Sequence, residues 1–274
     1  MYELRDVRKV FGDGTVALDG LSLTMGPGEQ VAVIGPSGAG KTTLFRIMNL
    51  TLRPTAGSLS LDGVDVSELS DADLRRTRMR IGTIYQQHNL VGRLKVVHNV
   101  LAGNLGRWST ARALYSLLRP QEVAAAGQAL AHVGIPEKLY SRTDDLSGGQ
   151  QQRVAIARVL IQNPDIILAD EPVSSVDPSL ASSIVALLTA VSAESRKTLV
   201  MNLHSVDLAL SYFLRIVGVR DGRIHFDLSP ATVTPELLAG LYAGHRDDER
   251  QLEHLRHGSS PFGGACRPLP GFRA

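Results

Sequence analysis

A glycine-rich loop near the N-terminus constrains the fold of this chain more than any other feature. It reads Gly35-Pro36-Ser37-Gly38-Ala39-Gly40-Lys41-Thr42. The loop follows Gln30–Ile34, which is apolar enough for a strand buried on both faces, and residues 41–50 after it have helical spacing. In such a strand–loop–helix unit, glycines let the backbone fold around an anion, and N–H groups at the start of the helix point at it. The sequence therefore predicts a phosphate-binding P-loop.

Each residue type in the loop has a predicted task. The lysine, Lys41, reaches the β- and γ-phosphates of a nucleotide, and the Thr42 hydroxyl is the expected Mg²⁺ ligand. The residues predicted to surround the phosphates are Gly35, Pro36, Ser37, Gly38, Ala39, Gly40, Lys41, Thr42 and Thr43. ATP and Mg²⁺ are the predicted ligands.

A second element is an apolar run that ends in two carboxylates, Ile166-Ile167-Leu168-Ala169-Asp170-Glu171. In enzymes with a P-loop, an aspartate at this place helps to hold Mg²⁺. The following glutamate can act as general base toward the attacking water. We therefore predict Asp170 as a metal ligand and Glu171 as a catalytic residue.

A third element looks redundant. Leu146-Ser147-Gly148-Gly149-Gln150-Gln151-Gln152-Arg153 again offers small residues at the start of a helix, where phosphate binds. One nucleotide needs only one such cradle. A dimer resolves this, because Ser147, Gly148, Gly149 and Gln150 can then cover the nucleotide held by the other subunit.

This octet resembles the signature sequence of ABC-transporter ATPases, and further motifs of that family follow in order. The resemblance implies that Gln86 senses Mg²⁺ and the γ-phosphate, that His204 contacts the γ-phosphate, and that Phe11 stacks on adenine. Residues 174–177, Ser-Ser-Val-Asp, resemble the loop that crosses the dimer interface, so Asp177 joins the predicted binding residues. The resemblance spans residues 1–243.

The rest of the chain fits an α/β fold with a P-loop NTPase core. Strand patterns at 57–61, 81–85, 166–169, 199–202 and 216–219 alternate with helical patterns at 72–80, 121–133, 149–162, 178–193 and 205–213. Two alternating stretches, at the N-terminus and at 18–25, predict an antiparallel β subdomain. Asp221-Gly222 predicts a hairpin.

Residues 87–162 have almost no strand pattern, which predicts an inserted α-helical subdomain. Residues 244–274 are polar and rich in Gly and Pro, and we expect a partly disordered tail after a domain at 1–243.

Composition excludes several alternatives. Net charge is +2, too small to indicate a nucleic-acid partner. No apolar run approaches the ~20 residues of a membrane span, and the N-terminus lacks the pattern of a signal peptide. A single cysteine, Cys266, allows no internal disulfide. We therefore expect a cytoplasmic chain, and we interpret the exposed charges Arg75, Arg76, Arg78 and Lys95 as solvated.

Residues 85–91 and 99–107 resemble the ATPase subunit of phosphonate importers, as do residues 150–158 and 203–208. This resemblance implies uptake of phosphonate, phosphate or phosphite into bacteria. It also implies a homodimer on the cytoplasmic face of the inner membrane, two integral-membrane permease subunits and a solute-binding protein. Two alternatives remain open at this point: an importer ATPase for another solute such as amino acids, and a soluble ABC ATPase without a transport role.

Overall fold

The computed structural model describes residues 1–174 and 176–244. Ser175 lies outside the described residues, and so does the tail predicted over 244–274 apart from Gly244, Cys266 included. The strands are β1 Tyr2–Val10, β2 Val16–Met25, β3 Gln30–Ile34, β4 Ala56–Leu61, β5 Val64–Asp65, β6 Ile81–Ile84, β7 Ile166–Asp170, β8 Thr198–Asn202, β9 Arg215–Arg220 and β10 Arg223–Leu228. The α-helices are α1 Lys41–Met48, α2 Asp71–Met79, α3 Val96–Leu101, α4 Thr110–Leu118, α5 Val123–His132, α6 Gly148–Gln162, α7 Pro178–Glu194, α8 Val206–Tyr212 and α9 Pro235–Tyr242. Short 3-10 helices cover Val66–Glu68, Ala102–Asn104 (η2), Pro136–Lys138, Thr143–Asp145 and Pro230–Thr232.

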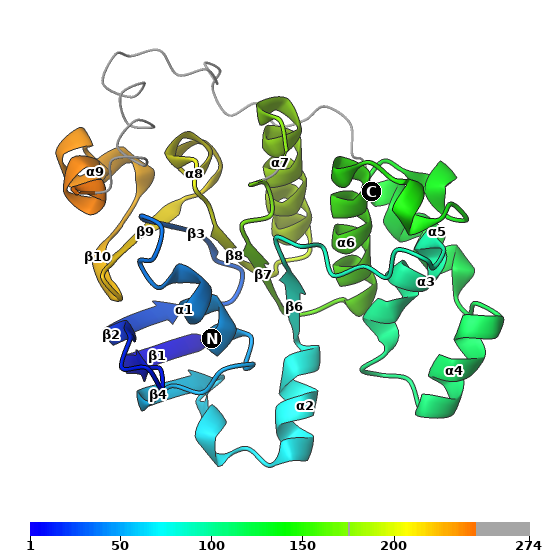
Figure 1. The fold of residues 1–274 in the computed structure, drawn as a ribbon, viewed down its shortest axis with the longest axis horizontal. Helices are drawn as coiled ribbons and strands as arrows, with labels where there is room; N and C mark the ends of the chain where they lie inside the picture. The colour runs from blue at the N-terminus through cyan, green and yellow to red at the C-terminus, as the bar shows by residue number, and fades with distance from the viewer. Residues whose placement is uncertain (175, 245–274) are drawn as a thin grey trace.

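The strands form two sheets. The larger has the order β10-β9-β3-β8-β7-β6, and its neighbours are parallel except for the β9–β10 hairpin. The smaller, β2-β1-β4-β5, is antiparallel. Figure 1 shows the larger sheet in the middle, with β1, β2 and β4 at one side and α3 to α6 at the other. The predicted fold class is confirmed, and the antiparallel strands form a sheet of their own.

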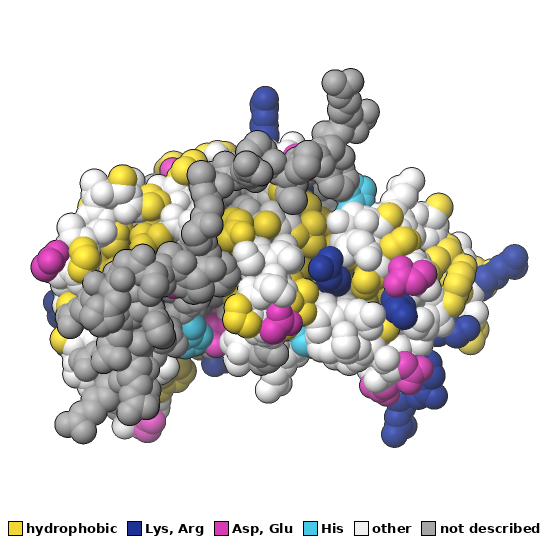
Figure 2. Space-filling view, turned by 90° about the horizontal axis from the view of Figure 1, so that it is seen from above, with side chains coloured by type: hydrophobic (Ala, Val, Ile, Leu, Met, Phe, Trp, Pro, Cys, Tyr) yellow, Lys and Arg dark blue, Asp and Glu magenta, His cyan; other side chains and the backbone are white. Residues whose placement is uncertain are grey.

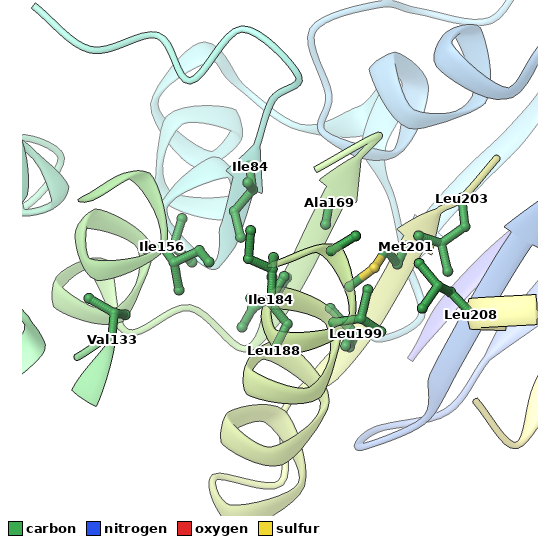
Figure 3. Packing of buried hydrophobic residues seen from close by; sticks show 14 of the residues in the cluster. Ile84, Val133, Ile156, Ala169, Ile184, Leu188, Leu199, Met201, Leu203 and Leu208 are labelled. Atoms are coloured by element: carbon green, nitrogen blue, oxygen red, sulfur yellow. The ribbon is translucent and has the colours of Figure 1, made fainter. Parts of the chain in front are cut away.

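The larger sheet is buried on both faces, as its continuous apolar strands predict. Alternate residues of β7 belong to two different apolar clusters: Ile167 and Ala169 to one, Ile166 and Leu168 to the other. The first cluster packs against α6, α7 and α8, where Ile156, Ile184 and Leu208 surround the strand residues in Figure 3. The second packs against α1 and the smaller sheet. The sheet is thus fixed between two layers.

Helix ends follow local signals. Ser147 caps α6 in a reciprocal capping box with Gln150, and Asp177 caps α7 ahead of proline at the first helical position. The predicted helices agree with the observed ones within a few residues, although the helix predicted over 41–50 ends at Met48.

Two features of the fold bear on partners. In the part of the chain that is described, no helix is long and apolar enough to cross a membrane. On the face shown in Figure 2, most Lys and Arg side chains lie toward the side that carries α3 to α6 in Figure 1.

Candidate nucleotide-binding site

The predicted site residues follow four neighbouring parallel strands. The order β3-β8-β7-β6 is contiguous, with Val33 and Asp170 both opposite Asn202, and Ile84 opposite Ala169. Parallel strands end at one edge of a sheet, and in open α/β sheets this is where ligands bind. The P-loop after β3, His204 after β8, Asp170–Glu171 on β7 and Gln86 after β6 therefore come to the same edge. The sequence predicted that each of these residues follows a strand, but it did not predict the order of the strands in the sheet. The observed strand order makes these residues neighbours.

The P-loop depends on glycines at two tight positions. Gly35 has φ 150°, and a Cβ there would collide with the Val219 carbonyl oxygen. Gly40, the N-cap of α1, has φ 99°, and a Cβ there would collide with the Ala17 carbonyl oxygen. Gly38 also has positive φ, at 81°, but the space around its Cβ position is open. The backbone of Val219 and that of Ala17 thus pack directly against the loop at Gly35 and at Gly40, where no larger side chain fits.

The lysine spans the loop from inside. Lys41 is only 4% exposed, and its Nζ donates to the carbonyl oxygens of Gly35 at 2.6 Å and Pro36 at 2.9 Å. The ammonium charge is therefore fixed against the backbone that would surround a phosphate. Thr42 and Thr43 occupy the first turn of α1, and Thr42 is exposed.

Asp170 is a partly buried carboxylate at the end of β7. Burial raises its pKa above the ordinary value, and the hydrogen bond from Asn202 Nδ2 to its Oδ1, at 2.7 Å, acts in the opposite direction. Asn202 is fully buried, and its own Oδ1 has no partner among the described residues. The sequence analysis missed Asn202. Its signal was an amide at the end of an apolar strand, but its role depends on the pairing of β8 with β7.

Glu171 and His204 contact each other directly. His204 Nε2 lies 2.7 Å from Glu171 Oε1. This hydrogen bond is the main reason why the pKa of Glu171 lies below its ordinary value, and burial opposes it. Glu171 also has a left-handed backbone, with φ 51°. Such strained conformations are frequent at functional sites. Because the pKa of Glu171 is lowered, its carboxylate is ionised at neutral pH and can accept a proton.

Gln86 lies at this edge too, but it is exposed and makes no hydrogen bond or ion pair within the described part of the chain. The other predicted residues lie elsewhere. Phe11 lies in the turn before β2, with Lys9 Nζ 5.6 Å from its ring centroid. The signature residues Ser147, Gly148, Gly149 and Gln150 begin α6, which Figure 1 shows well apart from α1. Asp177 accepts from the Leu180 N–H at 3.0 Å as the cap of α7, and this bond lowers its pKa.

Donor chemistry at the edge suits a magnesium ion. Mg²⁺ prefers oxygen ligands and is usually held by one or two carboxylates together with substrate phosphates and water. Asp170 supplies a carboxylate with an unshared oxygen, and Thr42 supplies a hydroxyl at the start of α1. No group of three or more His, Cys, Asp or Glu side chains in the described ranges is arranged to hold a metal by itself. A cation here would therefore need phosphate oxygens as further ligands.

A P-loop beside an acidic strand end, at the carboxyl edge of a parallel sheet with a helical insertion, defines a P-loop ATPase of the cassette type. Residues 18–174 match the ABC transporter family. The chain belongs to this family, and it binds ATP.

Named relatives are similar over most of their length. The phosphonates import ATP-binding protein PhnC 1 of Pseudomonas syringae pv. syringae (strain B728a) is 50% identical over 234 residues, which cover 85% of this chain and 88% of that protein. PhnC 2 of Pseudomonas aeruginosa (strain UCBPP-PA14) is 46% identical, covering 94% of this chain and 96% of that protein. PhnC 3 of Halalkalibacterium halodurans is 44% identical, covering 88% and 94%.

Solved structures give the same fold. The dimeric post-hydrolysis state of the ATP-binding cassette MJ0796, bound to ADP and Pi, has a TM-score of 0.72 and 31% identity. It covers 84% of this chain and 99% of that one. The cbiO1 subunit from Clostridium perfringens, part of the ABC transporter complex cbiONQ, has a TM-score of 0.73 and 26% identity, covering 92% and 98%.

Proposed function

We propose that this chain is the ATP-hydrolysing subunit of a bacterial importer for phosphonate or a related phosphorus oxyanion such as phosphate or phosphite. The observation that carries the proposal is 50% identity to a phosphonates import ATP-binding protein over 85% of the chain. The site described above supplies the chemistry of ATP hydrolysis. Cargo selection belongs to other subunits, so the site itself is silent about the cargo.

ATP hydrolysis follows from the side chains at the sheet edge. The P-loop N–H groups and Lys41 bind the phosphates. Thr42, Asp170 and Gln86 would hold Mg²⁺, which would supply positive charge to stabilise the phosphate groups during hydrolysis. Glu171 takes a proton from water as the water oxygen bonds to the γ-phosphorus and the bond to ADP breaks. His204, hydrogen-bonded to Glu171, would contact the transferred phosphoryl group.

The position of the signature residues supports a homodimer. Ser147 and Gly148 are exposed at the start of α6, and that end lies apart from the P-loop of the same chain. Two copies arranged head to tail bring each signature to the other copy's nucleotide. Phe11, in the turn before β2, would stack on adenine. Asp177, exposed before α7, borders the same interface.

A cleft at the boundary between core and helical insertion is our candidate contact for the permease subunits on the cytoplasmic face of the membrane. It has a volume of about 600 Å³ and lies between α2, η2 and the end of α6. Arg75, Arg76, Arg78 and Arg107 line it together with Met79 and Leu105. Its lining, taken from the described residues, includes no acidic side chain. Arg75, Arg76 and Arg78 are exposed, as predicted from the sequence, and Arg107 is exposed as well. The grouping of the four arginines favours a partner segment that is acidic and partly apolar.

Uptake measurements test the function and the cleft separately. Cells whose only copy of this protein is wild type, Glu171→Gln or Arg75→Glu/Arg107→Glu are given labelled methylphosphonate, phosphate and phosphite. ATP hydrolysis is measured on the purified chains. Glu171→Gln is expected to lower hydrolysis by about 10²-fold or more and to abolish uptake of one of the three solutes. The double charge reversal is expected to keep hydrolysis and lose the same uptake, whereas Arg119→Glu, an exposed site outside the cleft, keeps both.

Unchanged uptake of all three solutes in the Glu171→Gln cells would reject the cargo class. Normal uptake with the cleft variant would reject the cleft as the permease contact and leave the cargo class untouched. A solute-binding protein outside the cytoplasm completes the proposed importer.

A further inference from the structure

Among the described residues, the segment that follows Gln86 forms its hydrogen bonds to other elements with the helical insertion. Arg158 of α6 donates from Nη1 to the Asn89 carbonyl oxygen at 2.7 Å, and from Nη2 to the His88 carbonyl oxygen at 3.0 Å. The His88 ring also hydrogen-bonds the side chain of Gln151, one of the first residues of α6. Two residues of the signature helix thus hold the start of this segment.

The other end of the segment is held in the same way. Thr143 donates two bonds there: its N–H donates to the Leu94 carbonyl oxygen at 3.0 Å, and its Oγ1 donates to the same oxygen at 2.9 Å. Asn99 of α3 donates to the Val91 carbonyl at 3.0 Å and accepts from the Val91 N–H at 2.8 Å. Residues 88–94 are therefore bonded to the helical insertion at both ends, and Gln86 and Gln87 lie between these bonds and β6.

Arg158 is unusual among these groups because it is a largely buried cation. Burial lowers the pKa of its guanidinium, which nevertheless stays charged at neutral pH. No carboxylate lies within ion-pair distance of it among the residues that the structure describes. Two backbone carbonyls thus replace the water that this charge has lost. Bonds from a charged donor are the stronger kind, and losing them removes the protein partner of both carbonyls, of which that of His88 is part-buried.

We infer that Arg158 is a positioning residue that fixes residues 88–94 to the signature helix, so that a displacement of Gln86 reaches Ser147 as a movement of one rigid body. The inference rests on the proposed function, in which Gln86 contacts the nucleotide site and Ser147 contacts the nucleotide of a second copy. Arg158 itself touches neither. It acts through the backbone of His88 and Asn89.

The same helix offers a matched control. Arg153 also donates from its guanidinium to a backbone carbonyl, that of Val133 at 2.6 Å. That bond joins α6 to the end of α5 and stays within the helical insertion. Replacing either arginine removes a charged donor from a backbone carbonyl. Of the two arginines, Arg158 holds the segment after Gln86 and Arg153 does not.

The experiment compares full-length Arg158→Met, Arg158→Lys and Arg153→Met with wild type. We expect Arg158→Met to lower kcat for ATP hydrolysis about tenfold or more, since bonds from a charged donor are lost, with KM for ATP changed less than about twofold because the P-loop is intact. Amide hydrogen exchange of residues 88–94 rises in this variant. Arg158→Lys, which can still donate to these carbonyls, recovers part of kcat and part of the protection. Arg153→Met keeps kcat and the protection of 88–94.

Three outcomes would overturn the inference. One is an unchanged kcat with unchanged exchange in Arg158→Met. Another is an equal loss of kcat in both methionine variants with equal loss of thermal stability, which would mean a merely structural role. The third is no recovery with lysine. Should Arg158→Met fail to fold, Arg158→Lys against Arg153→Met decides by the same two readouts. A wild-type chain without ATPase activity would reject the proposed function, whereas exchange at 88–94 still tests Arg158.

Discussion

Two glycines of the P-loop share a positive φ but differ in what surrounds them, and this difference predicts separate effects of a single methyl group. At Gly40 the methyl would collide with the Ala17 carbonyl oxygen and come within 3.0 Å of Leu18 Cδ2. At Gly38 nothing lies within 4 Å. Both substitutions force a non-glycine residue into a left-handed backbone, which costs about 1–2 kcal/mol.

Only Gly40→Ala also requires β2 and the loop to move apart. Overpacking of this kind costs about 1–3 kcal/mol, which gives about 2–5 kcal/mol in total for Gly40→Ala against about 1–2 kcal/mol for Gly38→Ala. With about 2–4 °C of Tm per kcal/mol for a chain of this size, Gly40→Ala lowers Tm by roughly 4–20 °C and Gly38→Ala by roughly 2–8 °C. Gly12→Ala, with neither positive φ nor a neighbour within 4 Å, is the baseline.

Thermal unfolding and titration with a fluorescent ATP analogue measure the two effects. We expect Gly40→Ala to lose more stability than Gly38→Ala. We expect Gly38→Ala to lose affinity for the nucleotide while keeping most of its stability, because Gly38 lies in the phosphate-binding loop and nothing is within 4 Å of its Cβ position. Equal loss of Tm in the two variants would refute the reasoning, and so would full nucleotide affinity in Gly38→Ala.

Two further substitutions test the packing outside the site. Gly127 lies inside α5 with nothing within 4 Å of its Cβ position, so Gly127→Ala is expected to raise the free energy of unfolding by about 0.4–1 kcal/mol in urea denaturation; a loss would contradict this. Burial raises the pKa of the Tyr2 hydroxyl, which donates to the Met48 carbonyl. Because the folded-state pKa lies above the unfolded one, the contribution of Tyr2 is fully present below about pH 10 and is lost as pH rises beyond it. Tyr2→Phe is therefore expected to cost about 1 kcal/mol at neutral pH and to flatten the alkaline fall of stability seen in wild type; an unchanged slope would show that other groups cause it.

The sequence alone predicted those features that a short segment specifies without contacts to the rest of the chain. The P-loop, the acidic strand end and the capped start of α6 each lie within about eight consecutive residues, and their chemistry depends on backbone conformation and spacing. Helix α9 carried a readable signal as well, with Thr234 as cap and Pro235 at the first helical position, although the sequence analysis proposed no helix there. Such local features need no knowledge of the fold.

Other residues depend on partners far away in the chain. Asn202 acts on Asp170 through the pairing of β8 with β7, and Arg158 reaches His88 and Asn89, about 70 positions earlier. Asn202 carries only the weak signal of an amide at the end of an apolar strand, and Arg158 has no signal in its own segment. Even the meeting of Glu171 with His204 requires the strand order β3-β8-β7-β6, because a different order of the same strands would separate them.

Helix α6 connects these local and distant features. Its last residue, Gln162, donates from Nε2 to the Met79 and Ile81 carbonyls at 3.1 and 2.9 Å, which fixes that end to the start of β6. Its first end, at Ser147, is exposed.

The helix has 15 residues and is therefore about 22 Å long. A rotation of about 10° around the Gln162 end displaces the Ser147 end by about 4 Å, enough to make or break contacts to a phosphate. Because Arg158 lies one turn from the fixed end, a small displacement of His88 and Asn89 there corresponds to a larger one at the signature. We therefore expect substitutions near the start of α6 to change cooperativity between two nucleotides more than ATP affinity.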